Sequence, residues 1–295
     1  MSIQRFAFVI LTVLLSLPLP CVSQSNRKVK AKFTWQIDNT ENTSDLILRI
    51  MVPTTIEGRQ TVHSVQVSEK PDDDMTDNTG CRYLVFDFGS KAPRNLVMEV
   101  SMTLHKSGLG TSKRKHTEQP EAKYLASEEY IESDNPRIIA LADSLKAQTE
   151  TETVKNIMAF LAKTLTYDAG ERYTRQGNLV TLAKGTGLCN DYADLMIALC
   201  RANGIPARLS GGYLFNRDFI PGWDNDNWHV WVDVYLSEYG WVPFEPTRNE
   251  IQGWQSMPPQ YIYLAQDLAN SHINSTFNYS YKGWPPRIDS FFNIK

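Results

Sequence analysis

The first hundred residues alternate hydrophobic and polar positions in short runs. The clearest runs cover residues 30–35, 46–52, 83–88 and 96–102, and three valines recur in another at 62, 65 and 67. Turn-forming segments rich in Asp, Asn, Thr and Gly separate them. Alternation with a period of two is typical of strands that bury one face, and short strands at this spacing are typical of a β-sandwich. We therefore expect an all-β sandwich domain over residues 28–110.

The pattern changes after a polar segment over residues 111–127, which we interpret as a linker. Asn135 and Pro136 are typical of a helix start, and apolar positions then recur at helical spacing over 138–145 and again over 154–165. Two helices are therefore expected to lead into the part of the chain that carries candidate chemistry. We expect this second domain to cover residues 128–250 and to be of the α+β class.

A cysteine stands where a new helix is expected to begin. Residues 185–192 read Gly-Thr-Gly-Leu-Cys-Asn-Asp-Tyr and open an apolar run that stops at Asn203 and Gly204. The first turn of a helix has unpaired N–H groups and the positive end of the helix dipole, and both favour thiolate over thiol. Cys189 is thus a candidate nucleophile, and backbone N–H groups that include its own are candidate oxyanion donors.

A predicted β-hairpin supplies a histidine and two acids. Residues 227–235 alternate as one strand, turn at 237–240, and return over 241–247. Asp233 lies on the same strand face as His229 but about 13 Å away, at roughly 3.3 Å per residue, which is beyond hydrogen-bond reach. Glu245 lies on the returning strand, and one plausible register places it directly across from His229, although the sequence does not fix that register. The candidate catalytic set is therefore Cys189 as nucleophile, His229 as base and Glu245 as the carboxylate that orients the imidazole.

Four segments in this order resemble successive motifs of the transglutaminase-like superfamily: residues 187–193, 204–208, 229–233 and 240–247. The resemblance implies a papain-like fold, in which a helix that begins with the nucleophile packs on a small antiparallel sheet. It also implies that Cys189, His229 and Glu245 match the family's nucleophile, base and acid. The family usually has Asp at the position of Glu245, which is longer by one methylene. Upstream, the resemblance to bacterial envelope members implies an N-terminal β-domain and a helical lead-in.

The activity implied by this resemblance is acyl transfer at amide bonds of peptides or proteins. Cys189 would form a thioester, which water or a second amine would resolve, and we expect hydrolysis more than crosslinking. The alternative is a catalytically silent module of the same fold that binds envelope peptide or protein. Further candidates for substrate or oxyanion contacts are Gln176 and Asn178, upstream of the cysteine, and Trp228, beside the histidine.

Charge and residue spacing exclude several other functions. The chain has 30 Lys and Arg against 33 Asp and Glu, a formal net charge of −3, and no long basic tract. Such a chain lacks the excess of positive charge that attracts nucleic acid. A metal site formed by Cys189, Asp191 and His229 is disfavoured because no second Cys or His stands at ligand spacing. No cofactor is expected.

The ends of the chain differ from the rest. Residues 1–23 contain Arg5, an apolar run of about 12 residues and a small residue at Ser23, a pattern typical of a cleaved secretory leader. We expect an exported protein, periplasmic or extracellular, without a membrane-spanning segment after cleavage; lipid attachment at Cys21 is disfavoured because Pro20 precedes it. Residues 251–295 are rich in aromatics, and we expect them to pack on the catalytic domain.

Overall fold

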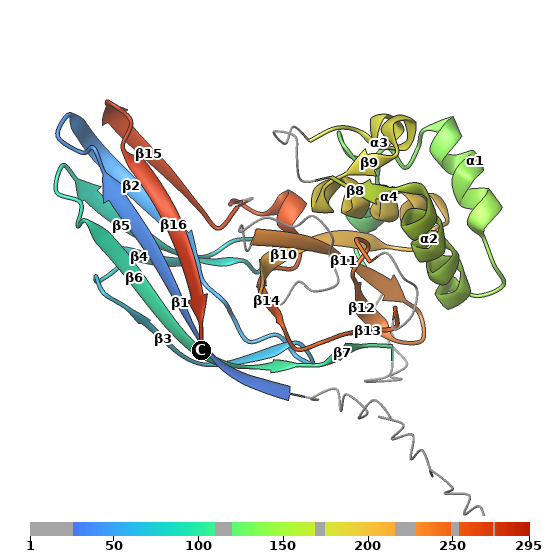
Figure 1. Ribbon diagram of the computed structural model, residues 1–295, viewed down its shortest axis with the longest axis horizontal. Coiled ribbons are helices and arrows are strands. Elements are labelled where there is room, and N and C mark those ends of the chain that lie inside the picture. The colour runs from blue at the N-terminus through green and yellow to red at the C-terminus, as the bar shows by residue number, and fades with distance from the viewer. Residues whose placement is uncertain (1–25, 110–119, 169–174, 216–227, 249–253, 274) are drawn as a thin grey trace, which may run out of the picture.

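The computed structural model describes residues 26–109, 120–168, 175–215, 228–248, 254–273 and 275–295 (Figure 1). The expected leader over residues 1–23 and the part of the expected linker over 111–119 lie outside the described residues. Figure 1 shows two β-sheets on one side, helices on the other, and a third sheet between them. The α+β class and the β-rich N-terminal region predicted from the sequence are confirmed.

The N-terminal region contains two antiparallel four-stranded sheets. The first has the strand order β16 (Arg287–Ile294), β1 (Asn26–Asp38), β6 (Asn95–His105) and β3 (Gln60–Val67). The second has the order β15 (Phe277–Gly283), β2 (Thr43–Met51), β5 (Arg82–Gly89) and β4 (Asp73–Thr76). Every second side chain of the central strands is buried, as the sequence pattern predicts. Examples are Phe33, Trp35, Leu48, Ile50, Leu96 and Met98.

The last two strands correct one expectation. Residues 251–295 were expected to pack on the catalytic domain, and β14 (Tyr261–Ala265) does pair with its sheet. However, β15 pairs with β2 and β16 pairs with β1, so that this prediction is wrong for the second half of the segment. The physical reason is the open edge of each sheet, where unpaired backbone groups and an apolar inner face require a partner strand.

Four helices form the other side of the molecule. They are α1 (Pro136–Leu145), α2 (Glu150–Thr164), α3 (Asn178–Lys184) and α4 (Cys189–Ala202), preceded by the short 3₁₀ turn η1 (Ala122–Leu125). The side chains of Asn135 and Thr149 cap α1 and α2 by accepting hydrogen bonds from the first-turn N–H groups. The three other helices contact α4, which is almost wholly buried.

The third sheet has the order β12 (Gly240–Phe244), β11 (Trp228–Leu236), β10 (Ala207–Leu214) and β14. Helix α4 packs on β10 and β11, where Val230, Val232 and Val234 join the core that it shares with this helix. Trp231 belongs to a separate apolar cluster with Tyr261 and Tyr263 of β14. The two faces of β11 therefore have different environments, as the alternation of valines with polar and aromatic residues predicts.

Short elements join the regions. Strand β7 (Ser107–Gly108) pairs with β13 (Ser256–Met257), β8 (Thr166–Tyr167) pairs with β9 (Thr186–Gly187), and the 3₁₀ turn η2 (Leu268–Asn270) follows β14. One continuous core of buried side chains extends from the sandwich into the helical region. Among the helices of the described residues, none is long and apolar enough to cross a membrane.

Candidate active site

Cys189 is the first residue of α4 and is half-buried. Its position agrees with the helix start predicted from the sequence. The backbone N–H groups of this first helical turn have no acceptor within the helix, and the helix dipole places partial positive charge there. The site therefore combines a thiol with backbone donors that can stabilise negative charge.

Asp191 organises the chain that leads into this cysteine. Its Oδ2 accepts a hydrogen bond of 2.9 Å from the backbone N–H of Leu188, and the backbone of Gln176 also favours its charged form. A Cβ on Gly187 would lie 2.6 Å from the Cβ of Asp191, so that only glycine allows this approach. Burial raises the pKa of the Asp191 carboxyl, although these backbone groups and nearby cations oppose the shift.

His229 lies on β11 and has a fully buried side chain. Its Nε2 is 2.7 Å from Oε2 of Glu245. Cys189 is among the groups that act on the imidazole and raise its pKa. Because Nε2 is engaged by the carboxylate, Nδ1 is the ring nitrogen available to the thiol. The structure thus brings together the three residues that the sequence analysis selected.

Glu245 directly follows β12, and four hydrogen bonds hold its carboxylate. In addition to His229, Oε2 accepts a bond of 2.9 Å from the hydroxyl of Tyr261. Oε1 accepts bonds from the backbone N–H and the hydroxyl of Thr247, at 3.1 and 2.6 Å. With both oxygens engaged in this way, the carboxylate has a fixed orientation despite its burial.

The hairpin register differs from the one considered in the sequence analysis. Val232 pairs with Phe244 and Asp233 with Pro243, so that the continued register places Glu245 across from Trp231 rather than His229. The two registers differ by two residues, and because side chains alternate between faces, Glu245 and His229 stay on the same face of the sheet. Glu245 therefore approaches His229 diagonally, and the extra methylene of glutamate supplies the reach that this diagonal needs.

The buried pair is ionised. Burial by itself lowers the pKa of His229, but the negative charge of Glu245 and the interactions with Cys189 and Glu245 more than offset it and raise that pKa to about 9. Burial opposes ionisation of Glu245 as well, yet the charge of His229 and the bonds from His229 and Thr247 lower its pKa. At neutral pH, the site therefore contains an imidazolium held by a carboxylate.

Asp233 does not take part in this arrangement, as its distance along the strand predicted. Its Oδ2 lies 3.5 Å from Nη2 of Arg208 on the neighbouring strand β10. The guanidinium of Arg208 in turn stacks over the ring of Trp241 at 4.1 Å. Asp233 is thus part of a buried ion pair in the sheet.

The three further candidates from the sequence have different environments. Asn178 is completely buried, and its Oδ1 accepts a bond of 2.8 Å from the backbone N–H of Glu132, which places it in the packing of α3. The backbone of Gln176 is among the groups that favour the charged form of Asp191. Trp228 is half-buried beside His229, packs against Gly211, and lies edge-on to Tyr213 at 6.5 Å.

The other two thiols of the described residues lie in apolar surroundings. Burial raises the pKa of Cys81 to about 11 and that of Cys200 to about 12. Both are therefore protonated at neutral pH and unreactive. The described residues contain no group of three or more His, Cys, Asp or Glu side chains that could hold a metal ion.

Sequence reasoning missed three residues of the site. Asp191 was considered only as a metal ligand, although its place three residues after Leu188 is the capping-box position that would have identified its role. Thr247 stands within the motif over 240–247 but was not singled out. Tyr261 has no local sequence signal, because it comes from β14, 16 residues after Glu245.

Comparison with known proteins gives the class of this fold and site. Residues 139–246, which include Cys189, His229 and Glu245, match the model of the transglutaminase-like superfamily. A solved structure from Cytophaga hutchinsonii, described as a candidate cysteine protease, aligns with a TM-score of 0.61 and 18% identity over 90% of each chain. The fold is therefore shared over nearly the whole chain. Residues 139–246 are thus similar to the core of this superfamily, as the motifs predicted.

Two sequence relatives match less than half of this chain. The uncharacterized protein YebA of Bacillus subtilis is 32% identical over 150 residues, which cover 42% of this chain and 20% of that protein. A protein-glutamine gamma-glutamyltransferase of Pseudomonas aeruginosa is 30% identical over 125 residues, which cover 38% of this chain and 18% of that protein. The chain thus matches about a fifth of the length of each of these two relatives.

Proposed function

We propose that this protein is a thiol enzyme that acts on amide bonds of peptides or proteins by acyl transfer through a thioester at Cys189. The observation that carries the proposal is the 2.7 Å contact between Nε2 of His229 and Oε2 of Glu245, with Cys189 among the groups that raise the pKa of the same imidazole. Such a buried, ionised pair beside a thiol at a helix start favours the thiolate, which is the nucleophilic form.

The proposed reaction has two steps. The Cys189 thiolate attacks the amide carbonyl carbon, backbone N–H groups at the start of α4 donate to the resulting oxyanion, and the His229 imidazolium gives its proton to the departing amine. In the second step, His229 takes a proton from water, the hydroxide attacks the thioester carbonyl, and the acid product leaves with the thiolate restored. Glu245 keeps the imidazole in one orientation and stabilises its charge in both steps.

Hydrolysis is proposed over crosslinking, with protein or peptide as the substrate. The glutamyltransferase relative indicates that an amine is the competing acceptor for the same thioester. The two outcomes share the first step and differ only in which nucleophile reaches the thioester. A single assay can therefore distinguish them.

Export of the protein is part of this proposal. It is supported by the charged start, the apolar run and the small residue at Ser23 within residues 1–23. If the protein is expressed in a bacterial host, we expect the envelope fraction to contain a chain that begins at Gln24. Recovery of an uncleaved chain from the cytoplasm would contradict export.

The activity test uses the purified protein with a mixture of peptides in ¹⁸O-labelled water, with and without an excess of a primary amine. Mass spectrometry is expected to show peptides cleaved or deamidated with one ¹⁸O incorporated. Incorporation of the amine instead would identify a transferase and overturn the hydrolytic part of the proposal. Absence of both products would support the silent binding module.

Alkylation supplies an independent measurement of the assembled site. Cys189 of the wild-type protein is expected to react with iodoacetamide at pH 6 much faster than Cys189 of the His229→Ala variant, because removal of the imidazolium removes the charge that favours thiolate. Cys81→Ala, which deletes a buried thiol of the sandwich, is the matched control and should leave the rate unchanged. Equal rates in wild type and His229→Ala would show that the pair does not activate the thiol.

A further inference from the structure

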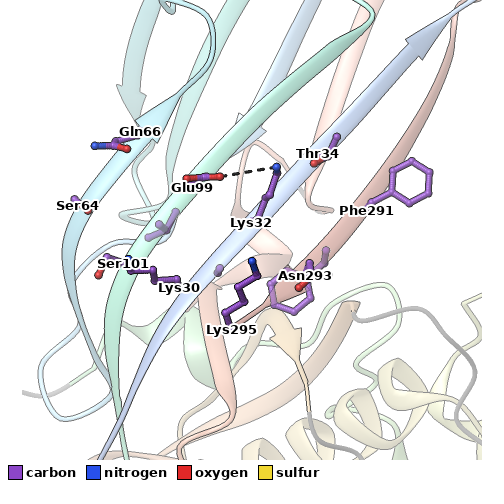
Figure 2. A pocket seen from close by; sticks show the side chains of 13 residues that line it. Lys30, Lys32, Thr34, Ser64, Gln66, Glu99, Ser101, Phe291, Asn293 and Lys295 are labelled. Atoms are coloured by element: carbon purple, nitrogen blue, oxygen red, sulfur yellow. Dashed lines mark ion pairs between the residues drawn. The ribbon is translucent and has the colours of Figure 1, made fainter.

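A groove lies on the outer face of the sheet formed by β16, β1, β6 and β3, away from the candidate active site (Figure 2). Its volume is about 1000 Å³, and all four strands line it. The strand pairing places its side chains in two rows that cross the sheet. One row contains Asn293, Lys32, Glu99 and Gln66, and the other contains Lys295, Lys30, Ser101 and Ser64.

The charge of the groove is opposite to that of the whole protein. Three lysine side chains, Lys30, Lys32 and Lys295, line it, and Glu99 is the one acidic side chain among the lining residues. Lys32 and Glu99 lie 3.9 Å apart and offset each other, which leaves Lys30 and Lys295 as the other charged side chains of the groove (Figure 2). The formal charge of the chain is −3. A local excess of positive charge on such a protein favours an anionic ligand.

The remaining side chains of the groove are hydrogen-bonding groups and one exposed ring. Thr34, Ser64, Gln66, Ser101 and Asn293 supply hydroxyl and amide groups. Phe291 is 56% exposed and lies beside Thr34 on the same face of the sheet. A flat apolar ring of this kind can pack against the C–H face of a sugar, while hydroxyls and amides bond to the sugar hydroxyls.

The hydrogen bonding of the sheet backbone favours a sugar chain over a peptide as the ligand. Main-chain N–H and C=O groups of β1 and β6 are used in the pairing with the strands on both sides. A peptide that lay across this face would therefore find no backbone partners for its own amide groups, which are costly to leave unpaired. A polysaccharide has no such requirement, because side chains alone satisfy its hydroxyls.

We propose that this groove binds an acidic polysaccharide, with Lys30 and Lys295 pairing with its acidic groups and Phe291 stacking on a sugar ring. The proposal does not rest on the proposed function of the thiol site, because the groove uses different residues on a different sheet. It assigns the sandwich the role of holding the protein on an anionic glycan surface.

The test compares two polymers of the same backbone, carboxymethyl-dextran and unmodified dextran, by affinity electrophoresis of the whole protein. Carboxymethyl-dextran is expected to bind at least tenfold more tightly than dextran, and increasing salt should weaken that binding. Lys30→Gln with Lys295→Gln is expected to reduce the affinity at least tenfold. Lys146→Gln with Lys155→Gln, two exposed lysines of the helical region, is the matched control and should change nothing.

Phe291→Ala tests the sugar contact apart from the charge. We expect it to weaken carboxymethyl-dextran binding several-fold and to leave any binding of poly-glutamate unchanged. Equal affinity for poly-glutamate and carboxymethyl-dextran, together with no effect of Phe291→Ala, would overturn the proposal in favour of an acidic protein partner. A dimer of the wild-type protein that dissociates in Phe291→Ala would instead identify a second copy as the occupant. No loss of binding in the double lysine variant would also overturn the proposal.

Discussion

The geometry of the site depends most on the side chain of Glu245. This residue lies across from Trp231, two residues away from the position directly opposite His229, and it still bonds to the imidazole because its side chain is long. Tyr261 and Thr247 then fix the two oxygens. A shorter acid at the same backbone position would have to give up the histidine or these supporting bonds.

Glu245→Asp is therefore expected to lower kcat/KM by tenfold or more, although the family that the sequence resembles usually has aspartate at this position. The reason is the diagonal register, in which a shorter side chain leaves the imidazole without its orienting acceptor. The measurement is the steady-state rate on whichever peptide the mass-spectrometric screen identifies. Glu238→Asp, at an exposed position of the same hairpin, is the matched control. Full activity in Glu245→Asp would show that the backbone adjusts to the shorter acid.

The raised pKa of His229 predicts a pH dependence of stability. Its protonated form is stabilised by Glu245 in the folded state, so the stabilisation is complete below the ordinary histidine pKa of about 6.5 and is lost as pH rises through about 9. We expect the denaturation midpoint of the wild-type protein to fall over this interval. The comparison protein is His229→Gln, whose denaturation midpoint should not show this fall with pH. If the midpoints of the two proteins change with pH in parallel, the raised pKa of His229 is contradicted.

At the scale of elements, the start of α4 depends on a close contact between glycine and an acid. Gly187 precedes the helix, and Asp191 reaches back over it to accept the Leu188 N–H. The loop before the cysteine is thus positioned by one side chain of the helix that follows it.

Gly187→Ala is expected to lower kcat at least tenfold and to cost about 1–3 kcal/mol of stability, because the new methyl group forces the Asp191 side chain and the start of α4 apart. Gly204→Ala is the matched control at the other end of the same helix. Gly204 has a φ of +77° with open space around it, so that alanine there strains the backbone and lowers stability by about 1 kcal/mol without moving Cys189. Similar kcat values in the two variants would show that the contact at Gly187 does not position the thiol.

The sequence predicts those elements whose patterns are local. Five strands of the sandwich follow from alternation, α1 and α2 follow from helical spacing with a start signal before α1, and the start of α4 follows from the glycines before Cys189. The register of the β11–β12 hairpin could not be predicted, since two registers that differ by two residues place the same side chains on the same face. The role of Tyr261 could not be predicted either, because it depends on how β14 lies beside β10.

At the scale of the whole molecule, an aromatic series connects the sandwich to the candidate site. Phe292 of β16 stacks on Tyr213 of β10 at 4.5 Å, and Tyr213 lies edge-on to Trp228, the neighbour of His229. Phe33 of β1 also contacts Tyr213, at 5.1 Å. The sheet that carries the histidine is therefore supported by strands from both ends of the described chain.

Phe292→Ala is expected to destabilise the whole protein by about 2–3 kcal/mol, since it removes a half-buried ring that packs on both regions. Urea denaturation followed by circular dichroism and by the alkylation of Cys189 should give one shared, lowered midpoint. Phe291→Ala, its exposed neighbour on the opposite face of β16, should shift neither curve measurably. Two separate midpoints in Phe292→Ala would show that the regions unfold independently.

The pairing of β1 with β16 also constrains how the protein is made. Ala31 pairs with Ile294, about 260 residues later, so that β1 has no partner on one side until β16 has been synthesised. During translation, that edge stays open while the helices and the central sheet are still being added. This sheet therefore closes only after those elements have been made, and a chain that crossed a membrane before folding would complete the sheet on the far side.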